Sequence, residues 1–231
     1  MIKTTGLTLH YGSSQILHGI DFEAKVGQIT CIMGTNGTGK TSLLKALAGT
    51  HPRSGGSVEL AGEIIEVLRP QQMAQRGLAI VPQGRMIFPL LTVRENLETA
   101  FALLPKSEHR IPTDIYDLFP VLKDMTHRRG GDLSGGQQQQ LAIARAMIMQ
   151  PKLLLLDEPT EGIQPNIIQQ IGHVLAYLKA KGGMAIVFVE QFFEFAYALA
   201  DYFYVLRRGA VSVFGPANNF EKAALRAEVS V

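Results

Sequence analysis

The sequence lacks the features that mark secreted or membrane-spanning chains. Cys31 is its one cysteine, so no disulfide bond can form within the chain, which fits a reducing compartment. No run approaches the roughly 18 uncharged apolar residues of a transmembrane helix, since the longest, such as 152–156 and 184–189, have the length of strands. Residues 1–6 carry no apolar core of a signal peptide. If the protein acts at a membrane, we expect another subunit to span it.

The chain also lacks a strong excess of charge of either sign. Its 22 Lys and Arg residues nearly balance its 20 Asp and Glu residues, which leaves a net charge of +2. A field this weak does not favour nucleic acid or an anionic bilayer as a partner. The nearest approach to a basic cluster, at 127–129, is expected in a solvated loop. With 46% hydrophobic and 18% charged residues, the 231-residue chain is predicted to fold as one large or two closely joined α/β units.

Strand-like apolar runs alternate with helix-like segments along most of the chain, which predicts a mostly parallel sheet covered by helices. Residues 2–60 are mainly β in character, with one helix at 40–48 that Gly49 is placed to cap. A short strand at 78–81 ends at Pro82. Further along, strands are predicted at 152–156, 185–189, 202–207 and 211–214, and helices from Pro165 and over 192–200.

Residues 92–131 differ from the rest because helical patterns dominate there and no convincing strand is present. The patterns at 92–104 and 113–119 are punctuated by prolines. A further helix is predicted over 134–149, with the glutamine run 137–140 on its exposed face. We interpret this region as a helical insertion carried by the α/β core.

A glycine-rich loop joins the strand predicted at 29–33 to the helix that follows it. Its sequence, Gly34-Thr35-Asn36-Gly37-Thr38-Gly39-Lys40-Thr41, matches the pattern G-x-x-x-x-G-K-[ST] in the strand–loop–helix context that the pattern requires. Glycines let successive N–H groups turn toward phosphate oxygens, and the helix adds the positive end of its dipole. Lys40 supplies a charge for the β- and γ-phosphates, and the Thr41 hydroxyl can ligate Mg²⁺. A chance match arises in roughly one chain in a hundred, so nucleotide binding is predicted, although many families share this loop.

Two adjacent carboxylates, Asp157 and Glu158, end the apolar strand predicted at 152–156. Alternation along a strand sends neighbouring side chains to opposite faces, so we expect the two to differ in role. Asp157 can join the Mg²⁺ shell, and Glu158 can polarise water for in-line attack on a γ-phosphate. A strand that simply ends in solvent is the alternative. The carboxyl end of a strand in an α/β sheet, however, is where ligands bind.

A third motif, Leu133-Ser134-Gly135-Gly136-Gln137, stands at the start of the helix predicted over 134–149. It could be no more than an N-cap serine followed by flexible glycines. It is also a second anion site, because exposed N–H groups and a helix N-terminus face outward there. One cradle and one outward-facing clamp indicate that two chains sandwich the nucleotide head to tail.

These three motifs, in this order, make the sequence similar to the ATP-binding cassette (ABC) family over nearly its whole length. Residues 34–41 resemble the Walker A loop, 133–137 the signature and 153–158 the Walker B strand. The resemblance implies an α/β fold, namely an ABC-type P-loop ATPase core with a β subdomain and a helical insertion. ATP and Mg²⁺ are the implied cofactors.

The same resemblance implies a single ABC ATPase domain over residues 1–231. Within it, residues 1–84 and 150–231 are expected to form a RecA-like core with an antiparallel β subdomain. Residues 85–149 are expected to form the helical subdomain.

The resemblance also assigns roles to single residues. Tyr11 matches the aromatic residue that stacks on adenine, although a tyrosine of an edge strand is the alternative. Gln83 falls where the family's Q-loop contacts Mg²⁺ and the transmembrane partner. The implied catalytic residues are Glu158, Lys40 and Gln191; the nucleotide-binding residues are Tyr11, Gly34, Thr35, Asn36, Gly37, Thr38, Gly39, Lys40, Thr41 and Ser42; the signature residues, which serve the partner's nucleotide, are Leu133, Ser134, Gly135, Gly136 and Gln137; and the metal ligands are Thr41, Gln83 and Asp157.

The chain departs from the family at two positions. Most members carry a histidine that contacts the γ-phosphate where this chain has Gln191, and an aspartate where it has Gln164. Glutamine can donate a neutral hydrogen bond, but it cannot carry positive charge. We hypothesise that the site on this chain's cradle hydrolyses ATP slowly, and that a different partner cassette with a full set would hydrolyse it faster. The alternative is that Gln191 suffices and both sites are equivalent.

Several apolar residues crowd beside Gln83, where the helical insertion begins. They are Met86, Ile87, Phe88, Leu90 and Leu91. Packing within the cassette is the default explanation for most of them. We expect some to stay exposed and to form a groove for a helix of the transmembrane partner. Gln83 would then relay the presence of the γ-phosphate to that groove.

Within the ABC family, segments 81–85, 157–165 and 189–196 resemble the short importer cassettes that serve branched-chain amino acids and urea or short amides. The second and third look most like the urea-importer cassette. The resemblance implies an ATPase that powers such an importer as a peripheral subunit on the cytoplasmic face of the membrane. The implied partners are a second ABC ATPase subunit, identical or different, the permease subunits and, indirectly, an extracytoplasmic solute-binding protein. Nucleic acid is not expected.

An alternative is the cytoplasmic ATPase of a lipid or lipopolysaccharide export system, although cassettes of that kind keep the histidine that Gln191 replaces. Ribosome-bound factors usually fuse two cassettes, and DNA-repair ATPases insert a long coiled coil. Small-molecule kinases need a dedicated acceptor site. None of these features is found in the sequence. The transported solute is not encoded here, because the binding protein and the permease choose it.

Overall fold

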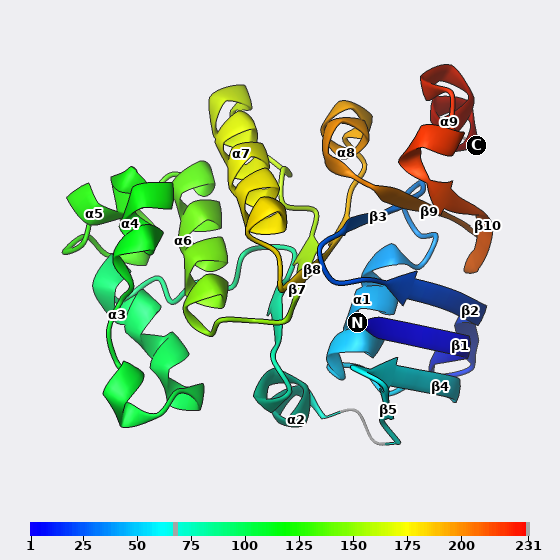
Figure 1. The fold of residues 1–231 in the computed structure, drawn as a ribbon, viewed down its shortest axis with the longest axis horizontal. Coiled ribbons are helices and arrows are strands. Elements are labelled where there is room, and N and C mark those ends of the chain that lie inside the picture. The colour runs from blue at the N-terminus through cyan, green and yellow to red at the C-terminus, as the bar shows by residue number, and fades with distance from the viewer. Residues whose placement is uncertain (67–68, 230–231) are drawn as a thin grey trace.

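The computed structural model describes residues 1–66 and 69–229 (Figure 1). Helices of residues 93–148 gather at one end of the molecule, and the strands nearest the N-terminus lie at the other end (Figure 1). Among the helices of the described residues, none has both the length and the apolar character to cross a bilayer.

The central sheet has six strands in the order β10-β9-β3-β8-β7-β6. Neighbouring strands are parallel, except for the antiparallel pair β9 and β10 at one edge. The strands are β3 (Ile29–Met33), β6 (Leu78–Val81), β7 (Leu153–Asp157), β8 (Ala185–Val189), β9 (Tyr202–Arg207) and β10 (Ala210–Pro216). The prediction of a mostly parallel sheet is confirmed. The bounds of β7 and β10 differ from those predicted by one or two residues.

Helices and a second sheet cover the two faces of this sheet, which is why its strands are continuous apolar runs. Every residue of β3, β7 and β8 is buried. On one face, Leu154 and Leu156 share a cluster with α6 (Gly135–Ile148), α7 (Pro165–Lys181) and α8 (Phe193–Leu199). On the other, Leu153 and Leu155 share a cluster with α1 (Lys40–Ala48) and the second sheet. Gly49 caps α1 in the left-handed conformation, as predicted.

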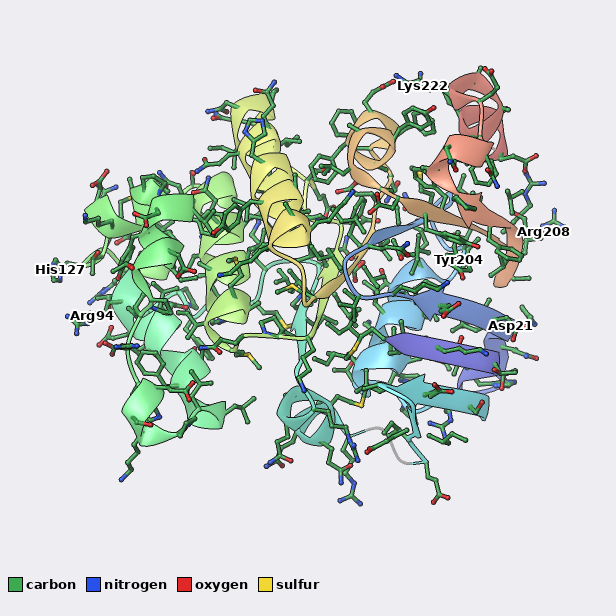
Figure 2. All side chains as sticks on the ribbon, in the orientation of Figure 1. Asp21, Arg94, His127, Tyr204, Arg208 and Lys222 are labelled. Carbon is green, nitrogen blue, oxygen red and sulfur yellow. The ribbon has the colours of Figure 1, made fainter. Side chains whose placement is uncertain are left out.

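The second sheet is antiparallel, with the order β2-β1-β4-β5. Its strands are β1 (Ile2–Tyr11), β2 (Ser14–Ala24), β4 (Gly55–Leu60) and β5 (Glu63–Ile64). Tyr204 of β9 joins the two sheets, because its ring centroid lies 4.7 Å from that of Phe22 and its hydroxyl accepts a hydrogen bond from Glu23 N at 3.0 Å (Figure 2). This contact holds the second sheet against the edge of the central one.

The helical end of the molecule is built from short elements (Figure 1). These are α3 (Val93–Glu98), α4 (Thr113–Leu118) and α5 (Pro120–Asp124), with 3₁₀ helices at Thr99–Leu103, Lys106–Glu108 and Gly130–Asp132, and they lie beside the longer α6. Over 92–131, all of which the structure describes, the only β pairing is an isolated bridge between Thr92 and Arg129. The predicted lack of strands there is confirmed. The basic residues 127–129 are exposed, as expected, and His127 projects from this end (Figure 2).

Two helical predictions differ from the structure. The helix expected at 92–104 changes to a 3₁₀ helix after Glu98, where Thr99 Oγ1 donates to Asn96 O at 2.6 Å and so competes with the helical hydrogen-bond pattern. The expectation of an exposed glutamine run is wrong for Gln139 and Gln140, which are buried. Gln140 Nε2 donates to Gln170 Oε1 of α7 at 2.9 Å, because α6 packs against a second helix on that side.

Three short α-helices of the described residues were not among the predictions. Two of them are α2 (Pro70–Gln75) and α5, and each begins with proline at its first position. The third, α9 (Lys222–Val229), lies beside α8, where Lys222 and Arg226 form ion pairs with Glu194.

Candidate active site

The glycine-rich loop lies between β3 and α1, at the carboxyl end of the central strand. A Cβ on Gly34 would lie 2.4 Å from Leu206 O, and one on Gly39 would lie 2.8 Å from Leu17 Cδ2. Both glycines also have positive φ angles, of 147° and 99°. A side chain at either position would therefore displace the loop. Gly39 is the N-cap of α1 and offers no side-chain hydrogen bond, so the N–H groups of the first turn stay free for an anion.

Lys40 is buried, with 4% of its surface exposed. Its Nζ donates to Gly34 O at 2.8 Å and to Thr35 O at 2.9 Å, so the ammonium group holds the two ends of the loop together. Burial lowers the pKa of Lys40, and the carboxylates of Glu158, Asp157 and Glu190 act in the opposite direction. A cation with this environment is suited to phosphate oxygens, which would add charge of the opposite sign.

One cavity, of about 360 Å³, brings together residues that the sequence predicted from four separate segments. Its lining includes Tyr11, Asn36, Gly37, Gly39, Lys40, Thr41, Ser42, Gln83 and Glu158. The other predicted loop residues shape the cradle from within: Thr38 Oγ1 donates to Thr35 O at 2.8 Å. The Tyr11 ring, 41% exposed, stacks on His51 with centroids 4.2 Å apart. It therefore presents an aromatic surface at the rim of the cavity.

Thr41, which lines this cavity, contacts Asp157, which is not among the lining residues. Thr41 Oγ1 donates to Asp157 Oδ1 at 3.1 Å, and Asp157 is 4% exposed. Burial raises the pKa of Asp157; the Thr41 hydrogen bond lowers it, the charge of Glu158 raises it, and Lys45 and Lys40 lower it. A buried carboxylate beside a hydroxyl offers the hard oxygen ligands that Mg²⁺ prefers, so these residues fit that ion.

Glu158 differs from Asp157 because of its backbone. Strand alternation was expected to point the two carboxylates to opposite faces. The structure gives another cause, because β7 ends at Asp157 and Glu158 has a φ of +48°. A non-glycine residue in the left-handed region is uncommon and is found preferentially at functional sites. This turn directs Glu158 toward β8, where its N–H donates to Val189 O at 3.0 Å and its Oε1 accepts from Gln191 Nε2 at 2.6 Å.

Gln191 follows β8 and lines a second cavity of about 410 Å³, which shares Asn36 and Glu158 with the first. The residue before it, Glu190, is 2% exposed and accepts hydrogen bonds from Thr160 and from the backbone of residues 191 and 192. Sequence reasoning missed Glu190. The available signal was an ionisable residue placed directly after a strand of five apolar residues and beside a predicted site residue.

Gln83 lies beyond β6 and contacts the segment that follows Glu158. Its Nε2 donates to Glu161 Oε2 at 3.1 Å, and Arg85 Nη2 donates to Glu161 O at 3.2 Å. Gly84, Arg85 and Met86 all have positive φ angles, of 77°, 68° and 47°. Three such residues in succession bend the chain sharply and turn Met86 outward, where 68% of its surface is exposed.

The residues Leu133, Ser134, Gly135, Gly136 and Gln137 are not among those that line either cavity near the loop. Ser134 is the N-cap of α6 in a reciprocal capping box with Gln137, as its interpretation as an N-cap predicted. Side chains at the two glycines would crowd their neighbours: a Cβ on Gly135 would lie 3.1 Å from the Arg85 guanidinium, and one on Gly136 would lie 3.1 Å from Ile167. Within one chain, this motif and the loop stand apart.

Comparisons with known proteins indicate the same family as the three sequence motifs. A family model described as ABC transporter matches residues 17–161. The chain is 40% identical over 212 residues to the high-affinity branched-chain amino acid transport ATP-binding protein BraG of Pseudomonas aeruginosa, with 91% of each protein covered. It is 36% identical over 219 residues to the probable branched-chain amino acid transport ATP-binding protein LivF of Archaeoglobus fulgidus, with 94% of this chain and 93% of that protein covered.

A solved structure supports the fold independently. A crystal structure of a nucleotide-free ATP-binding cassette from an ABC transporter superposes with a TM-score of 0.88 at 23% identity, over 100% of this chain and 98% of that one. The predicted cassette architecture, with its two sheets and surrounding helices, is confirmed.

Proposed function

The chain belongs to the ABC transporter family as an ATP-binding subunit of an importer, and from this premise we propose that its ATP hydrolysis powers the uptake of branched-chain amino acids. The observation that carries the proposal is the meeting of Lys40, Thr41 and Glu158 at one cavity, in a chain whose relatives BraG and LivF carry branched-chain amino acid transport in their names. Urea or short amides are a second candidate, which rests on the resemblance of segments 157–165 and 189–196 to the urea-importer cassette. The export system considered above is not favoured.

The mechanism follows from the positions of the side chains. The free N–H groups of the first turn of α1 and the Lys40 ammonium bind the phosphates. Thr41, Asp157 and Gln83 would hold Mg²⁺, which when bound neutralises charge on the phosphate oxygens. Glu158 polarises a water molecule for in-line attack on the γ-phosphate and accepts its proton. Gln191, already bonded to Glu158 Oε1, fixes the direction in which that carboxylate points.

A second cassette subunit completes the site in this proposal. Family members dimerise, and residues 133–137 lie outside the cavity of their own chain. Placed against a partner's cradle, the N-terminus of α6 and the Ser134 hydroxyl would contribute donors to the γ-phosphate of that partner's ATP. The sandwich closes when the nucleotide is bound and opens when hydrolysis removes the bridging phosphate.

The permease partner is proposed to dock beside Gln83. Met86, Phe88 and Leu90 are exposed by 68%, 48% and 79%, whereas Ile87 packs against the core. Next to them is a mostly apolar cavity of about 580 Å³ lined in part by Met86, Phe88 and Arg145. These features suit a helix of the permease, which would place the chain as a peripheral subunit on the cytoplasmic face of the membrane.

We also propose the domain boundaries expected from the family. Residues 1–84 and 150–231 form the core with its antiparallel sheet, and residues 85–149 form a helical subdomain that begins within the bend at 84–86. A solute-binding protein acts only through the permease.

The test is transport by the complete importer. The two cassette subunits and the permease that co-purifies with this chain are reconstituted into ATP-loaded vesicles, and the solute-binding protein is supplied outside. Leucine uptake coupled to ATP hydrolysis is expected. Lys40→Ala in this chain should abolish that uptake. Uptake of urea without uptake of leucine would select the second candidate. Absence of ATP hydrolysis in the complete complex would reject the proposed function.

A further inference from the structure

Glu190 is a buried carboxylate that the mechanism above does not use. It follows β8 directly, and 2% of its surface is exposed. Its Oε1 accepts from Thr160 Oγ1 at 2.6 Å and from Thr160 N at 2.9 Å. Its Oε2 accepts from Gln191 N at 2.9 Å and from Phe192 N at 3.1 Å. One side chain therefore ties together two segments that lie about thirty residues apart in the sequence.

The four donors match an ionised carboxylate, which can only accept hydrogen bonds. Burial raises the pKa of Glu190, and the hydrogen bonds from Thr160, Phe192 and Gln191 lower it. No salt bridge of the described residues involves this carboxylate. Burying such a group is unfavourable unless its acceptors are satisfied, so an apolar residue would fill the same space at less risk to stability. The charge of Glu190 is better explained by the segments that its hydrogen bonds fix in place, at Thr160 and at residues 191–192.

Both segments adjoin or contact Glu158, the proposed general base. Thr160 stands two residues after Glu158, and the backbone N–H of Gln191 is held by the same carboxylate. Gln191 Nε2 in turn donates to Glu158 Oε1 at 2.6 Å. The contacts close a ring that runs from Glu158 through Thr160, Glu190 and Gln191 back to Glu158. On the far side, Glu190 N donates to Ile32 O of β3 at 3.2 Å, so the ring is anchored in the central sheet.

We propose that Glu190 is a positioning residue, whose carboxylate holds the Thr160 turn and the Gln191 backbone so that the Gln191 amide stays bonded to Glu158. The inference rests on the proposed function, because it concerns the orientation of the base in ATP hydrolysis. Loss of the Glu190 carboxylate leaves the phosphate loop intact but lets the Gln191 amide and the Glu158 carboxylate separate. Misplacement of a catalytic group by about 1 Å can cost about 100-fold in rate.

A double-mutant cycle in the complete importer tests whether Glu190 acts through Gln191. Glu190→Gln puts a donor among four donors, and it should lower kcat for ATP hydrolysis about tenfold while KM for ATP changes less than about twofold. In a Gln191→Ala background, the same Glu190→Gln change should leave kcat within about twofold of the single variant. A tenfold loss in both backgrounds, or no loss in either, would overturn the proposal.

Matched variants separate positioning from folding. Thr160→Val removes one donor to Glu190 with little change of shape and should lower kcat. Thr160→Ser keeps the hydroxyl and should have the kcat of the unaltered protein. Glu194→Gln makes the same chemical change on the next helix, at an exposed residue paired with Lys222 and Arg226, and should leave kcat unchanged. A Thr160→Val variant as fast as Thr160→Ser would overturn the proposal even if Glu190→Gln failed to fold.

A second readout does not depend on hydrolysis. In the isolated full chain, amide hydrogen exchange at Thr160, Gln191 and Phe192 should be faster in Glu190→Gln than in the unaltered protein, while exchange in α1 stays the same. Unchanged exchange at all three amides would reject the positioning role. If the unaltered complex fails to hydrolyse ATP but these amides do respond, the proposed function fails and the structural role of Glu190 stands.

Discussion

The side-chain amide of Gln191 donates a 2.6 Å hydrogen bond to the carboxylate of Glu158. Glutamine holds the carboxylate with a neutral donor, where most members of the family are expected to carry an ionisable histidine. The bond positions the base without offering it a second titratable group. Exchange of Gln191 for histidine would test that difference directly.

Gln191→His should make hydrolysis at this chain's site faster, by several-fold, and sensitive to pH around the ordinary histidine pKa of about 6.5. The reason is that the imidazolium form can carry positive charge toward the γ-phosphate. The measurement is single-turnover hydrolysis over a pH series. The alternative, that Gln191 suffices, predicts equal rates for the two proteins and no new pH dependence.

Glu158→Gln should lower the hydrolysis rate by about 10²–10⁴-fold, because the neutral amide cannot accept a proton from water. ATP binding should persist, since Lys40 and the phosphate loop are untouched, and a closed pair of subunits loaded with ATP should accumulate. Equilibrium binding of labelled ATP and size-exclusion chromatography measure the two effects. Lys40→Ala is the contrasting variant, expected to lose binding itself. A Glu158→Gln protein that turns over ATP at the normal rate would remove Glu158 from the role of base.

Asn96→Leu should destabilise the chain by roughly 2–4 kcal/mol, because it removes the acceptor of the Phe88 N–H and three further hydrogen bonds from a fully buried side chain to backbone carbonyls. Asn96 is fully buried; its Oδ1 accepts from Phe88 N at 2.8 Å, and its Nδ2 donates to Phe88 O, Leu91 O and Thr92 O at 2.9, 3.1 and 2.9 Å. Chemical denaturation measures the loss. Arg94→Ala, on the exposed side of α3, should leave the unfolding midpoint unchanged. Similar midpoints for both variants would show that Asn96 does not hold this segment.

Gly209→Ala should destabilise the protein far more than Gly183→Ala. Both glycines have positive φ angles, of 76° and 78°, so both substitutions carry a backbone strain of about 1–2 kcal/mol. A Cβ on Gly209 would also lie 2.0 Å from Ile16 O, whereas one on Gly183 meets nothing within 4 Å. Gly209 N donates to Thr38 O at 3.1 Å, so ATP affinity should fall with stability in Gly209→Ala alone. Thermal unfolding and ATP titration check both expectations, which equal losses in the two variants would contradict.

Tyr204 should give a late phase in an alkaline titration followed by phenolate absorbance. Burial raises its pKa to about 12, from an ordinary value near 10. The native state therefore holds this proton more tightly than the unfolded state does. Its contribution to the free energy of unfolding is complete below about pH 10 and is lost as the pH rises through 12. Tyr204→Phe should remove the late phase, and Tyr177→Phe, at an exposed site, should retain it; persistence of the phase in Tyr204→Phe would assign it elsewhere.

The long apolar elements could be predicted from the sequence because burial on both faces leaves no ambiguity of pattern. Strand β8 has its predicted bounds, because it lies in an apolar run that begins after Gly183 and ends before Glu190. Short helices such as α2 and α9 have too few turns to display a period, and only the proline at the start of α2 marks it. The buried Gln140 could not be predicted, because its partner Gln170 lies on a different helix.

The cradle could likewise be predicted, because its glycines and Lys40 form a local pattern. The turn at Glu158 could not, since nothing in the sequence distinguishes a glutamate with a positive φ from one in a strand. Glu190 was missed for a related reason. Its four donors come from Thr160, Gln191 and Phe192, and the two segments meet only after β7 and β8 have paired.

The bonds from Lys40 to Gly34 O and Thr35 O have a consequence for the speed of ligand capture. The loop is already closed around the Lys40 ammonium group before any phosphate binds. The entropy cost of ordering the loop is therefore met on folding and does not weaken nucleotide binding. A nucleotide has only to replace the carbonyl oxygens of Gly34 and Thr35 with its own phosphate oxygens as acceptors for Lys40. Recruitment of nucleotide is thus a substitution within a preorganised receptor, and its rate should be set by encounter instead of by rearrangement of the backbone.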